Sequence, residues 1–234
     1  MAAVALEVQQ RSVLSAFAHD DPDTLPNTDH IPARIRMSRR ELSLIVERLI
    51  MALDCPQGMW PGVRDFVLET IAVTGAAGVD EFERAIAARE PGRSWLSARL
   101  TPDGIDAGGE SLLLAGDVIV NALLASAADD PAKPFVVTGL ASVIGYAGLD
   151  VRARYHGYAL TSEADHDAGT LRVSIERCDA DRDADVVQLL RDGVEVSGEQ
   201  WWRIYQPSNF ALSVESELSR THTGVSETLL HYSV

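Results

Sequence analysis

Apolar residues recur at helical spacing from position 42 onward, directly after a recognisable helix start. Ser38 is followed three residues later by Glu41, the spacing of a capping box in which each side chain satisfies an exposed backbone amide of the other. The apolar positions that follow are spaced as on one buried helix face: Leu42, Ile45, Val46, Leu49 and Ile50. A second apolar stripe runs through 63–71, and a third helix begins at Asp80. The pattern predicts a helical unit over residues 38–90.

The middle of the chain, residues 94–190, mixes alternating and continuous apolar segments. Alternation of apolar and polar residues indicates strands with one buried face, whereas a long apolar run indicates a buried helix. We predict strands at 94–100, 110–114, 135–137 and 185–190, helices at 116–128 and 140–147, and a β-hairpin formed by 151–156 and 171–176 around the turn 165–169. These segments predict a mixed β-sheet.

The two ends of the chain carry different signals. Residues 1–36 combine acidic residues with several prolines, a composition that cannot bury a core, so we expect an acidic, partly disordered lead. Ser197 is predicted to cap a closing helical region, 197–225. Residues 37–234 are therefore predicted to form a single α+β domain, with an N-terminal helical subdomain packed on a mixed β-sheet with C-terminal helices.

The charge of the chain restricts its partners. The 234 residues include 35 acidic and 20 basic side chains, a net charge of −15. A surface of that sign repels phosphate backbones and anionic lipid, so we expect no nucleic-acid partner and no membrane partner. The chain opens without a basic signal-peptide region, and we find no uninterrupted run of about 18 apolar residues. We expect a cytoplasmic protein.

Signatures of cofactor and metal chemistry are missing from the sequence. There is no glycine-rich nucleotide-binding motif and no His-Glu-x-x-His pair. Lys133, the only lysine, lies in a loop between two prolines, which argues against covalent catalysis through lysine. Cys55 and Cys178 do not suggest a disulfide framework, and we interpret Cys55 as buried and inert. The acidic segment 179–190 lacks the glycine and glutamate of a calcium loop. We expect no cofactor and no metal.

A short polar segment near the C-terminus is the strongest candidate for ligand binding. On a helix, Ser216, Ser219 and Arg220 would share one face. A guanidinium flanked by hydroxyls suits a carboxylate or a phosphate. We expect Arg220 to clamp an anion and the serines to donate hydrogen bonds, with Trp201 or Trp202 as the wall of the pocket. The alternative is structural: Ser216 and Glu217 cap a helix, Arg220 pairs with Glu217 or Glu215, and the tryptophans belong to the core.

Two residues are candidates for proton transfer if the protein is an enzyme, a question the sequence leaves open. General acid–base catalysis needs a titratable group beside the substrate, and Glu217 lies within the polar segment. His156 is predicted on a strand next to Gly157, which would let a ligand approach closely. The alternative for His156 is a polar position on the outer face of the hairpin.

The chain resembles a bacterial family known only as a domain of unknown function. Its members open with a capped helix, a turn containing glycine and tryptophan, and a second helix; they close with a tryptophan-bearing helix and a Ser-Glu-x-Ser-Arg stretch. The matching parts here are 37–69, Trp201-x-Arg203-Ile204 and 216–220 with Gly224, while Pro61 and Pro207 depart from the pattern. The resemblance implies the fold outline over 37–225 and implies no reaction.

Two functions follow as hypotheses. The first is an intracellular protein that binds or transforms a small anionic metabolite. The alternative is a non-catalytic partner subunit of a metabolic enzyme complex, whose acidic surface would dock a basic protein partner and whose segment 1–36 would become ordered on binding. A homo-oligomer is also left open.

Overall fold

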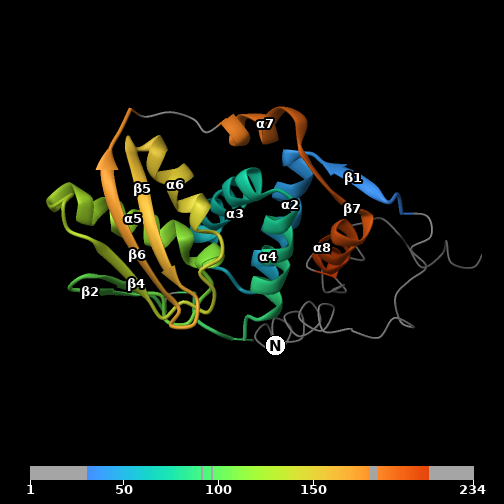
Figure 1. Cartoon of the computed structure of the whole chain (residues 1–234). Helices are drawn as coiled ribbons and strands as arrows, with labels where there is room; N and C mark the ends of the chain where they lie inside the picture. Colours follow the sequence, from blue (N-terminus) through green and yellow to red (C-terminus); the bar gives the residue numbers. More distant parts are fainter. Residues whose placement is uncertain (1–30, 91, 96, 180–183, 211–234) are drawn as a thin grey trace, which may run out of the picture.

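The computed structural model of the chain describes residues 31–90, 92–95, 97–179 and 184–210. It confirms the α+β class, with a mixed β-sheet at one end of the molecule, a helical layer in the middle, and a two-stranded pair with a closing helix at the opposite end (Figure 1).

The first helices of the described chain lie in the segment 38–90, which was predicted to be helical. The bounds of the helices are α2 Arg39–Ala52, the 3₁₀ turn η2 Gln57–Met59, α3 Trp60–Thr74, α4 Ala76–Ala87, α5 Leu112–Asp129, α6 Tyr146–Tyr155, α7 Ala184–Asp192 and α8 Gly198–Phe210. Helix α3 lies at the centre of the fold, where it contacts α2, α4, α5, α6 and α7. All five apolar residues predicted to form the buried face of α2 are 0–1% exposed. The predicted helical unit over residues 38–90 is therefore confirmed, although its third helix begins at Ala76 and not at the predicted Asp80.

The main sheet has the strand order β2-β3-β4-β6-β5 within the described residues. Its strands are β2 Arg99–Thr101, β3 Gly104–Asp106, β4 Phe135–Thr138, β5 Tyr158–Asp165 and β6 Thr170–Arg177. The β3–β4 pair is parallel and the other pairs are antiparallel, so the sheet is mixed as predicted. One face of β6 is buried beneath helices and the other is exposed, which explains the clean alternation of its sequence.

A second, two-stranded sheet joins the beginning of the described chain to its end. Strand β1, Arg34–Met37, pairs antiparallel with β7, Val194–Ser197. Met37 is fully buried, and Arg34 bonds Glu195 across the pair at 2.7 Å. The folded domain therefore begins earlier than the predicted residue 37, because residues 34–36 already belong to β1. Residues 1–30 of the predicted lead lie outside the described residues.

Several predicted strands are helical in the structure. Residues 110–114 contain the N-cap and first turn of α5, and 185–190 lie in α7, where Val186 and Leu189 are buried at helical spacing. Residues 151–156 lie in and just after α6, not in the first strand of the hairpin, which is β5. Alternation over six residues also fits a short helix, and packing decided between the two.

Two further predicted elements differ. The strand predicted at 94–100 is reduced to β2, which makes a tight hairpin with β3. The helix predicted at 140–147 is a loop up to Gly145, because this stretch bonds to the start of α5: Leu112 N–H donates to Ser142 O at 2.8 Å. Satisfied in this way, the loop backbone needs no helical hydrogen bonds.

Helix α5 meets the length and composition expected of a membrane span, contrary to the sequence-based expectation that no such stretch exists. Half of the window is buried inside the protein, where Ile119 and Leu123 lie in the core. Its Gly116 lies against the ring of Phe66, so a Cβ there would overlap the ring. A buried core helix passes the same test, and these contacts identify α5 as one.

The predicted caps at Ser38 and Ser197 are both present. Ser38 Oγ accepts from Glu41 N at 3.2 Å, while the Glu41 carboxylate accepts from Trp201 Nε1 at 2.9 Å instead of completing a capping box. At α8 the box is reciprocal, since Ser197 Oγ accepts from Gln200 N and Gln200 Oε1 accepts from Ser197 N, both at 3.0 Å.

Replacing Ser38 with alanine is expected to lower the free energy of unfolding by about 1 kcal/mol, because a backbone N–H at the start of α2 loses its acceptor. Urea unfolding at fixed pH measures the loss. Ser43→Ala, within the same helix, is the matched control and should change stability by only a few tenths of a kcal/mol. Equal effects of the two substitutions would contradict the capping role.

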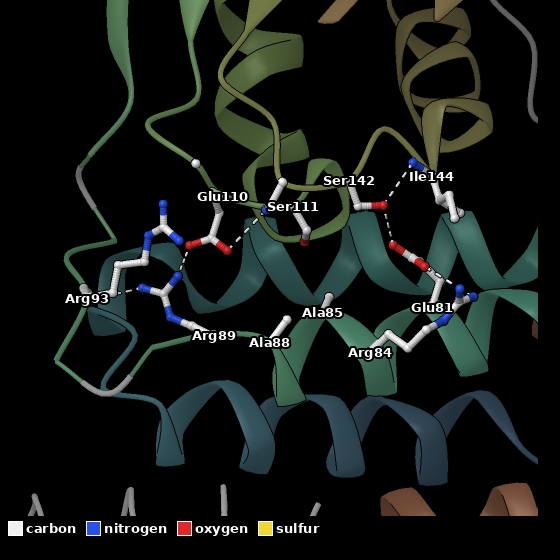
Figure 2. A pocket seen from close by; sticks show the side chains of 12 residues that line it. Glu81, Arg84, Ala85, Ala88, Arg89, Arg93, Glu110, Ser111, Ser142 and Ile144 are labelled. Carbon is white, nitrogen blue, oxygen red and sulfur yellow. Dashed lines mark hydrogen bonds and ion pairs between the residues drawn. The ribbon is translucent and has the colours of Figure 1, made fainter. Parts of the chain in front are cut away.

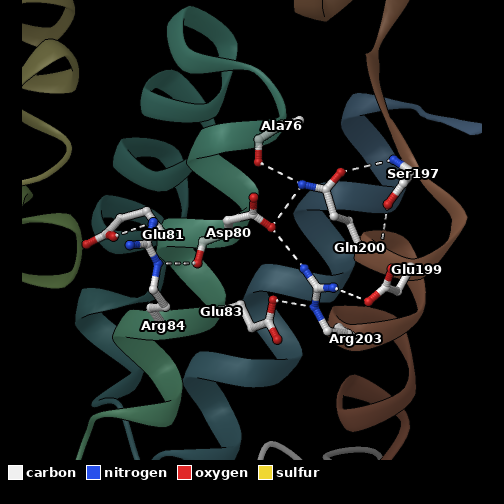
Figure 3. A network of polar contacts seen from close by, with 9 residues as sticks. All are labelled: Ala76, Asp80, Glu81, Glu83, Arg84, Ser197, Glu199, Gln200 and Arg203. Carbon is white, nitrogen blue, oxygen red and sulfur yellow. Dashed lines mark hydrogen bonds and ion pairs between the residues drawn. The ribbon is translucent and has the colours of Figure 1, made fainter.

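Helix α8 is held on α4 by a network of polar contacts (Figure 3). Arg203 donates to Glu83 at 2.8 Å, to Asp80 at 3.0 Å and to Glu199 of its own helix at 2.9 Å. The next residue, Ile204, is fully buried. The Trp-x-Arg-Ile stretch therefore attaches the closing helix to the helical layer. The remainder of the predicted closing region, 211–225, lies outside the described residues.

Candidate functional site

A cavity of about 200 Å³ lies between α4, the start of α5 and the loop that precedes α6 (Figure 2). Helix α4 supplies one wall because Glu81, Ala85 and Ala88 follow at spacings of four and three residues and so share a face. The opposite wall is tied together by backbone bonds, with Ala141 N–H donating to Glu110 O at 3.0 Å and Ser111 bridging to Ser142. We call this cavity the α4 cleft.

One end of the α4 cleft is built around a buried ion pair. The Arg89 guanidinium contacts the Glu110 carboxylate, and their side chains are only 1% and 9% exposed. Arg89 Nη2 also donates to Arg93 O at 2.8 Å, and its Cζ lies 4.0 Å from the centre of the Trp95 ring. Glu110 accepts from Ser111 N at 3.2 Å. Each charged group is thereby held in one orientation.

Burial changes the ionisation of two groups at this end. Desolvation, followed by repulsion from Arg93, lowers the pKa of Arg89 to about 10, so the guanidinium stays charged at neutral pH. Desolvation raises the pKa of the Cys55 thiol to about 12, and the nearby Arg89 charge only partly opposes it. A thiol that keeps its proton is a poor nucleophile. The interpretation of Cys55 as buried and inert agrees with its 5% exposure.

The other end of the cleft holds a second buried carboxylate. Glu81, whose side chain is 3% exposed, accepts from Ser142 Oγ at 2.8 Å and pairs with Arg84 at 3.2 Å. Ile144 N–H donates to the same serine oxygen at 3.3 Å. Arg84 itself is 62% exposed, so its charge reaches the solvent at the rim.

The lining of the cleft is locally positive. Three arginines, Arg84, Arg89 and Arg93, face the two glutamates, Glu81 and Glu110, which leaves a net charge of +1. The whole chain carries −15. A small cavity with a positive lining on an acidic protein concentrates anions relative to the rest of the surface.

Of the sequence-predicted site residues that the structure describes, Trp201, Trp202 and His156, none lines the α4 cleft. Trp201 and Trp202 lie on α8, where Trp201 bonds Glu41 and stacks on Tyr205 with ring centres 4.3 Å apart. These contacts favour the structural alternative for Trp201, as part of the packing of α8 on α2. Neither tryptophan lines the cleft.

The remaining predicted residues fall in two places. His156 is exposed and caps the C-terminus of α6 through its backbone N–H, so its predicted placement on a strand is wrong. Gly157 follows it in a left-handed conformation, φ +78°, which is the turn from α6 into β5. The four residues of the C-terminal segment, Ser216, Glu217, Ser219 and Arg220, lie outside the described residues.

Sequence reasoning missed the residues of the α4 cleft. A usable signal existed on one side, because Arg84 and Arg89 flank small residues at helical spacing. Glu110, the partner of Arg89, and Ser142, the partner of Glu81, come from segments predicted as a strand and a helix, so no local pattern linked them to α4.

A second cavity, of about 340 Å³, lies between α3, α6 and the buried side of the sheet. Its walls are mostly apolar, including Leu149, Leu160 and Val173. The charged group in its lining, Asp150, already accepts from Leu160 N at 2.8 Å and from Arg154 Nε at 2.8 Å. Such a lining does not suit an anion.

A buried polar cluster also joins the three helices α3, α5 and α6. Arg152 donates to Glu69 at 2.6 Å and to Asp117 at 3.3 Å, with all three side chains at most 25% exposed. Burial raises the pKa of Glu69 to about 7, although Arg152 opposes the shift. No cavity opens onto this cluster among those described above, and we assign it a structural role.

Within the described residues, no three His, Cys, Asp or Glu side chains are grouped so that they could hold a metal ion. The expectation of a metal-free protein stays a prediction, since four of the six histidines, His19, His30, His222 and His231, lie outside those residues.

Comparison of the chain with protein-family models, curated proteins and solved structures found no match.

Proposed function

We propose that the protein binds a small anionic metabolite in the α4 cleft. The observation that carries the proposal is the grouping of Arg84, Arg89 and Arg93 around one cavity of a strongly acidic chain. Guanidinium groups are the usual partners of carboxylates and phosphates because their planar N–H donors match two oxygens at once.

The three arginines have different roles in this proposal. Arg89 is committed to Glu110 and keeps the cavity wall in place. Arg93 is half-buried at the same end and donates one hydrogen bond, to Gly108 O. A guanidinium carries five N–H donors, so Arg93 has further donors for a ligand. Arg93 is therefore the principal anion ligand, whereas Arg84 pairs with Glu81 at the other end of the cleft. The cavity volume of about 200 Å³ is below the usual range for drug-sized ligands, which favours a small metabolite.

The experiment compares ligand-induced thermal stabilisation of three arginine variants. Wild-type protein is screened against small carboxylates and phosphates, and stabilisation follows the ratio of ligand concentration to the dissociation constant. Arg93→Ala is expected to abolish the stabilisation by any hit. Arg99→Ala, on the exposed strand β2, removes the same charge away from the cleft and should leave it unchanged.

The Arg220→Ala variant separates this proposal from the site predicted in the C-terminal segment. If the α4 cleft binds the anion, Arg220→Ala keeps the wild-type stabilisation. Loss in Arg220→Ala with retention in Arg93→Ala would move the site to the terminal segment. Absence of stabilisation by every carboxylate and phosphate at millimolar concentration would reject anion binding and favour the partner-subunit hypothesis.

A further inference from the structure

The α4 cleft has two polar ends separated by an apolar floor (Figure 2). Arg89, Arg93 and Glu110 gather at one end, and Glu81 with Ser142 at the other. Between them the floor carries the methyl groups of Ala85 and Ala88. A ligand that fills the cavity therefore meets two separate sets of polar groups.

The two ends differ in charge. At the first end, two arginines face one glutamate, a net charge of +1, which suits an anionic group. At the second end the Glu81 carboxylate is 97% buried, since its side chain is 3% exposed, and its basic partner Arg84 is 62% exposed. Because the Arg84 side chain reaches the solvent, it can turn away when a ligand cation takes its place at Glu81, so that the buried carboxylate stays paired.

A buried carboxylate whose cation can leave is a receptor for a positive group. Glu81 Oε1 is fixed by the Ser142 hydroxyl at 2.8 Å, and Oε2 is the oxygen that faces Arg84 at 3.2 Å. A primary ammonium on the ligand, which only donates hydrogen bonds, can replace the Arg84 guanidinium at Oε2. The buried position makes such a charge-assisted bond stronger than one at the surface.

The spacing of the ends sets the shape of the ligand. Glu81 and Ala87, the last residue of α4, are six residues apart, which is about 9 Å along the helix axis, and Arg89 and Arg93 follow after the helix has ended. The adjacent charges of an α-amino acid backbone cannot reach both ends. A chain of several methylenes between the charged groups can, and it would lie on Ala85 and Ala88.

We propose, on the basis of the proposed anion-binding function, that the ligand is an elongated zwitterion, with a carboxylate or phosphate at the Arg93 end and a primary ammonium at Glu81. The ligand class is thus that of ω-amino acids and related chains that end in an amine.

The test measures dissociation constants for chemically matched probes by titration calorimetry. The probes are ω-amino acids with four to eight carbons, the monocarboxylates of the same length, and norleucine as the α-amino isomer of the six-carbon chain. The best ω-amino acid is expected to bind at least about tenfold more tightly than its monocarboxylate and than norleucine, since one charge-assisted contact distinguishes them.

Two variants assign the difference to Glu81. Glu81→Gln keeps the shape of the side chain and its contact with Ser142, and it should reduce the tenfold preference to about one while the monocarboxylate still binds. Arg84→Gln removes the competing cation and should increase the preference. The Arg84 variant keeps the test informative if Glu81→Gln lowers the melting temperature below the assay range.

The outcomes separate the inference from the function on which it rests. Equal affinity of wild-type protein for ω-amino acids and monocarboxylates at every length overturns the zwitterion and leaves anion binding standing. A preference that persists in Glu81→Gln and is unchanged in Arg84→Gln also overturns it. If no carboxylate of either series binds and no phosphate stabilises the protein, the proposed function itself fails.

Discussion

Arg89→Ala is expected to lower the free energy of unfolding by about 3–5 kcal/mol. The substitution leaves the Glu110 carboxylate, which is 9% exposed, without its cation and removes the guanidinium stacked on Trp95. Removing one partner of a buried ion pair costs this much because the other partner stays charged, buried and without a counter-charge. Urea unfolding monitored by tryptophan fluorescence measures the loss.

The double variant Arg89→Met with Glu110→Leu tests the cause of that loss. Replacing both members of a buried ion pair with apolar residues of similar size is often neutral or stabilising. We therefore expect the double variant to recover most of the stability lost by Arg89→Ala. Arg34→Ala, which breaks an ion pair with Glu195 whose side chains are 81% and 44% exposed, is the matched control and should cost at most about 1 kcal/mol. A double variant as unstable as the single one would show that shape and not charge holds this end of the cleft.

The stability of the wild-type protein is expected to fall as the pH rises from 4.5 to 7, to the extent that Glu69 contributes. Burial between α3, α5 and α6 raises the pKa of Glu69 from its usual 4.5 to about 7. The folded protein therefore binds this proton more tightly than the unfolded chain, and its contribution is complete below pH 4.5 and lost through pH 7. At about 1.4 kcal/mol for each pH unit, the interval from 4.5 to 7 amounts to about 3 kcal/mol.

Glu69→Gln isolates this contribution. Glutamine is neutral at every pH and has nearly the same shape, so the difference in unfolding free energy between variant and wild type should shift by about 3 kcal/mol toward the variant between pH 4.5 and pH 8. Urea unfolding at intervals of half a pH unit follows the shift. Glu163→Gln, an exposed carboxylate on β5, should leave the pH dependence unchanged. A parallel pH dependence of Glu69→Gln and wild type would contradict the raised pKa.

Helix starts were predictable because the contacts that define them are local. Ser38 and Ser197 each accept a hydrogen bond from a backbone N–H three residues later. A three-residue contact depends on nothing outside that segment. The apolar face of α2 was predictable for a related reason, because five apolar residues at helical spacing can all be buried at once only if they form one face of a helix.

The short segments of the middle were predicted less well. Residues 151–156 read equally as an alternating strand or as a helix turn, and what made them the end of α6 is a contact 83 residues away, where Arg152 bonds Glu69 on α3. The strand β1 escaped prediction because its partner β7 is remote: Arg34 and Glu195 are 161 residues apart. Neither partner could be inferred from spacing within one segment.

The sequence by itself determined the α+β class, the capped starts of α2 and α8, and a strongly acidic chain whose cations are nearly all arginine. These properties follow from composition and from contacts a few residues long. Only the tertiary structure decided where the arginines act. Arg89 meets Glu110, and Glu81 meets Ser142 61 residues away, because α5 and the loop before α6 pack against α4. Packing between remote segments, and not any local pattern, creates the α4 cleft.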